Sequence, residues 1–213
     1  MSKAVELLNV SKAFGAVKAL DEINLGFGKG EVVAFLGPNG AGKSTLLRIV
    51  SAQIMPTAGT VKVFGVDALR EPEEVKRNVG FVGHRSFLYD ELTVEENLSF
   101  YGSFLEATSE DLDRVIRIAD IDRWRGVKAG HLSYGLKKRS DIARALLGNP
   151  GILVLDELFS GLDVEISGRL VKYLSDQRER TILVSSHSMA QVREFCSRGV
   201  HLMRGRIERD AGL

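Results

Sequence analysis

The stretch EVVAFLGPNGAGKST, residues 31–45, decides the fold class. An apolar run ends at Leu36, a glycine-rich loop follows, and helical periodicity begins at Lys43. A strand, a tight loop and a helix in this order form the repeating unit of parallel sheets. The stretch therefore predicts an α/β fold in which crossover helices connect a largely parallel sheet.

The loop GPNGAGKST, residues 37–45, has the composition of a polyphosphate-binding turn. Its glycines let backbone N–H groups approach phosphate oxygens, and the helix that follows directs the positive end of its dipole at the same anion. The lysine would reach the terminal phosphates, and the serine would ligate magnesium. A glycine-rich turn with a solvated lysine is the alternative, which the flanking strand and helix disfavour. The expected nucleotide-binding residues are Gly37, Pro38, Asn39, Gly40, Ala41, Gly42, Lys43, Ser44 and Thr45.

A second apolar run, ILVL at 152–155, is followed at once by Asp156 and Glu157. Such a run is typical of a strand buried on both faces, and ligands of open α/β sheets bind where these strands end. On this stretch alone the two acids could equally be solvated. A magnesium–nucleotide at the same sheet edge would give Asp156 a metal to bind and Glu157 a water to orient and deprotonate.

Apolar runs and helical patterns alternate along most of the chain. The expected strands lie at 5–10, 31–36, 60–65, 78–83, 152–155, 181–186 and 200–203. The expected helices begin at Lys43, Val94, Glu110, Tyr134, Val164 and Met189. We expect one domain, 1–213, with a nucleotide-binding core at 1–84 and 149–213 and an inserted helical subdomain at 85–148.

Composition sets broader limits. The 213 residues are 44% hydrophobic, enough for one substantial core, and the net charge of +1 argues against a nucleic-acid partner. Cys196 is the only cysteine, so we expect a packed thiol, no intrachain disulfide and a reducing compartment. The first residues, MSKAVELLNV, lack the long apolar stretch typical of a signal peptide, and no window approaches the ~18 consecutive apolar residues of a membrane span. A soluble protein that reaches a membrane only through a partner is therefore expected.

Five motifs together resemble the nucleotide-binding domain of ATP-binding cassette transporters. Their order and spacing agree with that family over essentially the whole chain. The motifs are GPNGAGKST from Gly37 (Walker A), LSYGLKKR from Leu132 (signature), ILVLDE from Ile152 (Walker B), SGLD from Ser160 (D-loop) and SSH ending at His187 (switch). The resemblance implies a P-loop NTPase fold with an N-terminal antiparallel β portion, and ATP and Mg²⁺ as cofactors.

The resemblance also implies a head-to-tail dimer, either a homodimer or a cassette heterodimer. Each ATP would lie between the Walker A motif of one subunit and the signature of the other. The roles that this assigns are adenine stacking for Phe14, γ-phosphate contacts for Ser133 and Gly135, nucleotide binding for Asp163, metal binding for Ser44 and Asp156, and catalysis for Glu157 and His187. Taken alone, Phe14 is more typical of a core residue.

The residues around the signature give independent support for an anion there. Ser133 can cap the helix that follows, and its first turns carry Lys137, Lys138 and Arg139 with no acid before Asp141. Cations at a helix N-terminus oppose its dipole, and a bound phosphate would relieve that cost. A basic, solvated helix face is the alternative.

Three departures from the family pattern affect the site. His84 stands where a glutamine usually contacts the metal, and is still expected as a metal ligand because a neutral imidazole can replace that contact. A histidine here resembles the haem-exporter ATPases of cytochrome c maturation. Leu158 replaces a proline, which frees the backbone after Glu157. Tyr134 and Leu136 replace glycine and glutamine in the signature, and we still expect an active ATPase.

The resemblance therefore implies an ATP-hydrolysing subunit that powers transport through a separate transmembrane permease subunit, peripheral on the cytoplasmic face of the membrane. Residues 85–96 would engage that permease, through Phe87, Leu88, Tyr89 and Leu92 unless these form the subdomain core. The alternative is a soluble cassette of an assembly system such as iron–sulfur cluster biogenesis. A module that only binds ATP is disfavoured by the intact Glu157 and His187. Cargo and direction of transport are not encoded in these motifs.

Overall fold

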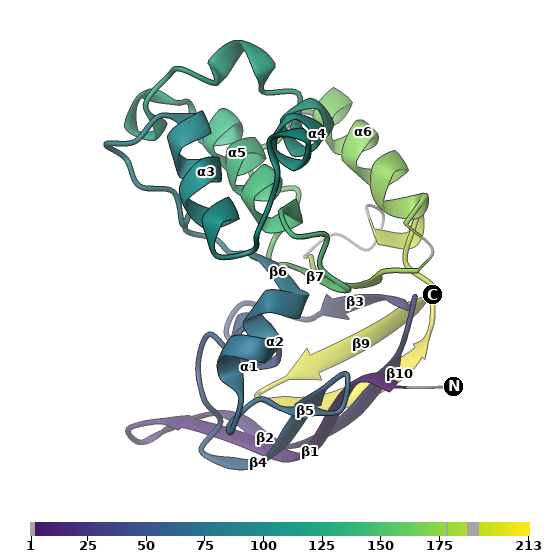
Figure 1. The fold of residues 1–213 in the computed structure, drawn as a ribbon. Helices are drawn as coiled ribbons and strands as arrows, with labels where there is room; N and C mark the ends of the chain where they lie inside the picture. The colour runs from purple at the N-terminus through teal and green to yellow at the C-terminus, as the bar shows by residue number, and fades with distance from the viewer. Residues whose placement is uncertain (1–2, 178, 187–191) are drawn as a thin grey trace.

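The structure is a computed structural model that describes residues 3–177, 179–186 and 192–213. Figure 1 shows two sheets on one side of the molecule and most of the helices on the other. The strands are β1 Lys3–Phe14, β2 Val17–Gly28, β3 Val32–Leu36, β4 Ala58–Val63, β5 Val66–Asp67, β6 Val79–Val82, β7 Ile152–Leu155, β8 Thr181–Ser185, β9 Arg198–Met203 and β10 Arg206–Gly212. The helices are α1 Lys43–Val50, α2 Pro72–Asn78, α3 Val94–Ser103, α4 Ser109–Ala119, α5 Tyr134–Leu146 and α6 Val164–Ser175, with 3₁₀ turns at Asp122–Trp124 and Ala129–His131.

The larger sheet has six strands in the order β10-β9-β3-β8-β7-β6. Its strands pair in parallel from β9 to β6, and β10 is added antiparallel at one edge. The smaller sheet, β2-β1-β4-β5, is antiparallel throughout. The predicted fold class, a largely parallel sheet with an N-terminal antiparallel portion, is confirmed.

The six-stranded sheet separates two hydrophobic cores. Along β3, Val33 and Phe35 face the core that contains α1 and the four-stranded sheet, whereas Ala34 and Leu36 face the core under α3, α4, α5 and α6. Both faces are buried, which explains why the central strands appear in the sequence as uninterrupted apolar runs.

Most expected elements are present within a residue or two of their predicted starts. The helix expected from Met189 begins outside the described residues. The sequence patterns did not indicate β2, β5, β10 or α2. Among the described residues, 85–148 contain helices and turns but no named strand, and the division of the chain into a core and an inserted subdomain stays a prediction. No helix in the described ranges has the length and apolarity needed to cross a bilayer.

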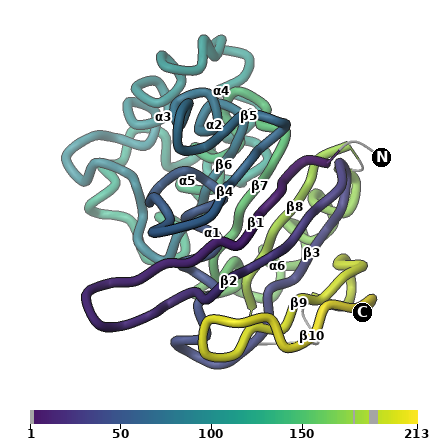
Figure 2. The backbone as a smooth tube through the Cα atoms, turned by 90° about the horizontal axis from the view of Figure 1, so that it is seen from below, coloured from purple at the N-terminus to yellow at the C-terminus, as the bar shows by residue number. Residues whose placement is uncertain are grey.

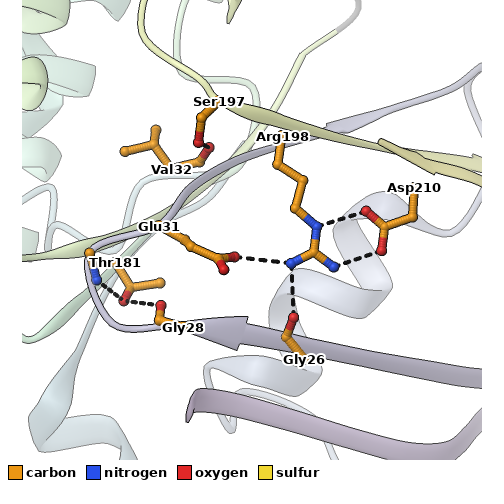
Figure 3. Close-up of polar contacts among 9 residues, drawn as sticks. Gly26, Gly28, Glu31, Val32, Thr181, Ser197, Arg198 and Asp210 are labelled. Carbon is orange, nitrogen blue, oxygen red and sulfur yellow. Dashed lines mark hydrogen bonds and ion pairs between the residues drawn. The ribbon is translucent and has the colours of Figure 1, made fainter. Parts of the chain in front are cut away.

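The C-terminal hairpin is fastened to the rest of the molecule by Arg198 of β9 (Figure 3). Its guanidinium binds both carboxylate oxygens of Asp210, at 2.7 and 2.6 Å. Its Nη1 also donates to Gly26 O at 2.9 Å and to Glu31 Oε2 at 3.0 Å. The strand β10 consequently lies against β2 (Figure 2), so the two sheets meet along this edge.

Candidate functional site: a nucleotide site at the sheet edge

The glycine-rich loop connects β3 to α1 at the carboxyl edge of the six-stranded sheet. Gly37 and Gly42 have φ values of 139° and 106°, which side chains rarely adopt. A Cβ on Gly37 would lie 2.2 Å from the carbonyl oxygen of Leu202, so the neighbouring strand excludes a side chain there. Around Gly40 nothing lies within 4 Å of such an atom, which leaves that part of the loop open to a ligand.

Lys43 supplies the cation of this loop. Its ammonium donates to the carbonyl oxygens of Gly37, at 2.7 Å, and Pro38, at 3.0 Å, and the side chain is buried. Burial lowers the pKa of Lys43, while the charges of Glu157 and Asp156 oppose that shift. An ammonium that donates to backbone carbonyls is well placed to exchange them for phosphate oxygens.

Ser44 and Asp156 meet although 112 positions separate them in the sequence. Ser44 Oγ donates to Asp156 Oδ1 at 3.0 Å, and Ser185 Oγ donates to the same oxygen at 2.6 Å. Asp156 is only 1% exposed. The donor set fits Mg²⁺, which prefers hard oxygens and takes few ligands from protein. In the described ranges no three His, Cys, Asp or Glu side chains are arranged to hold a metal ion by themselves, so phosphate and water would complete such a site.

Glu157 follows β7 in an unusual backbone conformation. Its φ is 53°, in the left-handed region, and its N–H donates to Ser185 Oγ at 2.9 Å. The next residue, Leu158, is 1% exposed and packs in the core beneath α3–α6. Replacement of the usual proline therefore leaves this turn anchored, by a buried side chain instead of a ring.

The signature begins α5 and packs against the SGLD loop of the same chain. Ser133 caps the helix as predicted, accepting from Leu136 N at 3.4 Å. The Tyr134 ring lies over Gly161, where an added Cβ would come within 2.1 Å of it. Asp163, at the end of that loop, caps α6 by accepting from Ile166 N at 2.8 Å.

The basic residues in the first turns of α5 do not form a solvated face. Lys137 is paired with Asp90, and Arg139 donates to Ala119 O at 2.7 Å. Lys138 is 5% exposed, and burial lowers its pKa against the opposing charges of Asp141, Asp156 and Glu157. The alternative of a basic solvated face is therefore wrong for Lys138.

Two further expected site residues, Phe14 and His84, lie apart from this cluster. Phe14 ends β1 in the projecting β1–β2 hairpin (Figure 2), is 52% exposed and is covered by the Lys12 ammonium, so it is not a core residue. His84 is exposed and lines a cavity of about 410 Å³ between the loop after β6 and α5, and no hydrogen bond in the described ranges joins it to Ser44 or Asp156. His187 lies outside the described residues.

Sequence patterns missed two residues that contact this site. Ser185 ends β8 and holds both Asp156 and Glu157, and the only available signal was its place at the end of a buried strand beside β7. For Lys138 the sequence predicts either a phosphate-facing cation or a member of a solvated basic face, whereas the structure buries it behind the carboxylates.

The family model described as ABC transporter matches residues 20–160. The relatives include the ABC transporter ATP-binding protein NatA of Bacillus subtilis, 34% identical over 90% of this chain and 80% of its own length. The bacitracin transport ATP-binding protein BcrA of Bacillus licheniformis is 32% identical, over 92% of this chain but 65% of BcrA. The chain thus spans about two thirds to four fifths of these relatives.

Solved structures of ATP-binding cassettes are also similar to this chain. The structure of an ATP-binding subunit of an ABC transporter superposes with a TM-score of 0.91 at 28% identity, covering 99% of this chain and 90% of that one. A dimeric ATP-binding cassette in a post-hydrolysis state, bound to ADP and Pi, gives 0.87 at 30% identity over 98% of both chains. The glycine loop, the adjoining acids and these similarities lead to one conclusion. The chain belongs to the ABC transporter family and is an ATP-binding, ATP-hydrolysing cassette.

Proposed function

We propose that this cassette binds Mg²⁺–ATP through Lys43, Ser44 and Asp156 and that Glu157 is the general base for hydrolysis. The carrying observation is the 3.0 Å hydrogen bond between Ser44 Oγ and Asp156 Oδ1, which brings the Walker A and Walker B motifs to one point. Two oxygen ligands and a buried ammonium at the carboxyl edge of the sheet suit a polyphosphate with its metal.

The residues divide the chemistry between them. Lys43 would leave the carbonyls of Gly37 and Pro38 and bind the terminal phosphates, neutralising their charge. The Glu157 carboxylate would accept a proton from the attacking water. Mg²⁺, when bound, would stabilise negative charge on the phosphate oxygens. Ser133 and Gly135 of a second subunit would close the site.

The remaining expected residues keep their assignments as proposals. They are adenine stacking for Phe14, a nucleotide contact for Asp163, γ-phosphate sensing for His187, a metal contact for His84, and backbone contacts for Asn39, Gly40, Ala41, Gly42 and Thr45.

Substitution of the base tests this chemistry. Glu157→Gln should still bind ATP while kcat falls by about 10²–10⁴-fold, the usual loss for a missing general base. Glu165→Gln is a matched control, because Glu165 lies on the exposed face of α6 and pairs with Arg169. Wild-type kcat in Glu157→Gln would show that another group activates the water.

We further propose that ATP-driven closure of a dimer powers transport through a separate membrane subunit, at the cytoplasmic face of the membrane. An exposed aromatic surface supports a partner at the helical side: Phe87 is 39% and Tyr89 51% exposed, and the Tyr89 ring contacts Phe100, which in turn contacts Phe104. Leu88, at 7%, belongs instead to the core. Their exposure leaves Phe87 and Tyr89 available for the proposed docking surface, whereas the burial of Leu88 fits the alternative of a subdomain core.

A capture experiment distinguishes a transport ATPase from an ATPase of a soluble assembly system. Trapped Glu157→Gln protein with ATP would be incubated with detergent-solubilised membranes of the native cell, and bound proteins identified by mass spectrometry. ATP-dependent recovery of a polytopic membrane protein, reduced in a Phe87→Ser/Tyr89→Ser variant, supports the transport role. Recovery of soluble partners alone would favour an assembly system such as iron–sulfur cluster biogenesis.

A further inference from the structure

Lys138 is a buried ammonium that contacts two separate parts of the site. Its Nζ donates to Gly83 O at 3.0 Å and lies 3.4 Å from Asp156 O, at the longer limit of a hydrogen bond. Gly83 immediately precedes His84, and Asp156 immediately precedes Glu157. One side chain thus holds the backbone just before each of two expected site residues.

The peptide between Asp156 and Glu157 is held at both ends. Lys138 lies at its carbonyl oxygen, and Ser185 Oγ accepts from its N–H at 2.9 Å. The orientation of this peptide sets the φ angle of Glu157, which is 53°. A left-handed conformation at a residue other than glycine persists only when its surroundings impose it. These two hydrogen bonds are among the contacts that hold it, together with that from Ser160 N to Glu157 O at 3.2 Å.

Lys138 belongs to a row of charged side chains on α5 that contacts the end of β6 and the loop that follows it. Arg144 Nη2 donates to Phe81 O at 2.5 Å, and Asp141 Oδ1 accepts from Phe87 N at 3.4 Å. Positions 138, 141 and 144 are spaced by three and share one face of the helix. The helix that begins with the signature is therefore tied to segment 81–87 along its length, and Lys138 extends that connection to the end of β7.

We propose that Lys138 is a positioning residue for hydrolysis, which holds the Asp156–Glu157 peptide in the orientation that aims the Glu157 carboxylate and links that orientation to the signature helix. The inference rests on the proposed role of Glu157 as the base. Lys138 touches neither water nor phosphate in this assignment and acts only through Glu157.

A double-mutant cycle tests the proposal. Lys138→Met removes the donor but keeps the length and apolar stem of the side chain. We expect kcat to fall about 10–100-fold, the effect of losing charged hydrogen bonds in the hydrolysis geometry, while the affinity for a fluorescent ATP analogue changes by less than about twofold. In the Glu157→Gln background, Lys138→Met should lower the residual rate by less than about twofold, because the group it positions is already gone. Lys172→Met, an exposed lysine on α6, is the matched control.

Each outcome separates this proposal from the one it rests on. Wild-type kcat in Lys138→Met, or the same fold loss in both backgrounds, overturns the role of Lys138 and leaves that of Glu157 standing. Wild-type kcat in Glu157→Gln overturns the role of Glu157 itself, and with it this inference. If Lys138→Met does not fold, Lys138→Gln decides: its shorter amide reaches one carbonyl, so kcat should fall about 3–10-fold, and a kcat within about twofold of wild type overturns the proposal.

Discussion

Glu157 has a left-handed backbone conformation, and we expect this conformation to lower the free energy of unfolding of the protein. A residue with a Cβ loses about 1–2 kcal/mol in this region relative to right-handed conformations. Asparagine tolerates the region better than other residues because its short amide bonds locally with the backbone. The free energy of unfolding of Glu157→Asn should therefore be higher than that of Glu157→Gln. Both variants lack the carboxylate, and they differ chiefly in how well the new residue accepts a φ of 53°.

The expected difference is about 0.5–1 kcal/mol, because asparagine relieves only part of the strain. For a chain of this size it corresponds to a rise in Tm of about 1–4 °C. Loss of the Coulombic attraction between Glu157 and the two buried lysines is common to both variants, so it cancels in the comparison.

The assay is urea and thermal unfolding of the nucleotide-free variants, followed by circular dichroism. Glu165→Asn and Glu165→Gln form the control pair, since Glu165 lies in the first turn of α6. In helical backbone glutamine is the better residue, so the order of stability there should reverse. Equal or lower stability of Glu157→Asn relative to Glu157→Gln would refute the claim that the backbone at this position is strained.

Three other predictions follow from two buried side chains, Cys196 and Asp141, and from the close approach of Gly37 to Leu202. Burial raises the pKa of Cys196 from its ordinary 9.0 to about 12, so the native thiol keeps a proton that the unfolded chain loses. The unfolding free energy should therefore fall between about pH 9 and 12, by about 1.4 kcal/mol per pH unit, in wild type but not in Cys196→Ala; alkylation should be slow until urea is added. Arg144→Met should destabilise the fold by about 3–5 kcal/mol in urea titrations, because it leaves the fully buried Asp141 without its ion-pair partner, and Asp141→Ala/Arg144→Met should recover part of that loss. Gly37→Ala should weaken ATP binding at least about tenfold in equilibrium titrations, because its Cβ would overlap the Leu202 carbonyl and displace the loop; unchanged affinity would contradict the close approach.

Local patterns predicted the parts of the fold whose side chains are buried on both faces or repeat with a helical period. The central strands β3, β7 and β8 and the helices α1, α5 and α6 are of this kind. The strand β2 escaped because irregular pairing with β1 breaks the alternation of its side chains. β10 escaped because it is an edge strand with most of its residues exposed. Short segments without a continuous apolar face show little of the hydrophobic periodicity from which helices and strands are predicted.

The site divides in the same way. The glycine loop and the pair Asp156–Glu157 are contiguous, so their chemistry is visible in the sequence. The contact of Lys138 with Gly83 spans 55 positions and involves a backbone carbonyl, which every residue possesses. No composition or spacing rule marks such an acceptor. Only the folded chain shows that a lysine from the signature segment lies behind the carboxylates.

The Arg198 contacts also bear on how the chain folds during synthesis. Arg198 and its acceptor Gly26 O are 172 positions apart, and the N–H of Asp21 likewise donates to Gly205 O at 2.9 Å. The edge of the N-terminal sheet is therefore completed by residues that leave the ribosome about 170 positions after it. At about 5–20 residues per second, β2 waits roughly 10 s or more with that edge unpaired. Such non-local closure slows folding, and until it occurs the nascent β1–β2 hairpin presents an unpaired strand edge that favours aggregation.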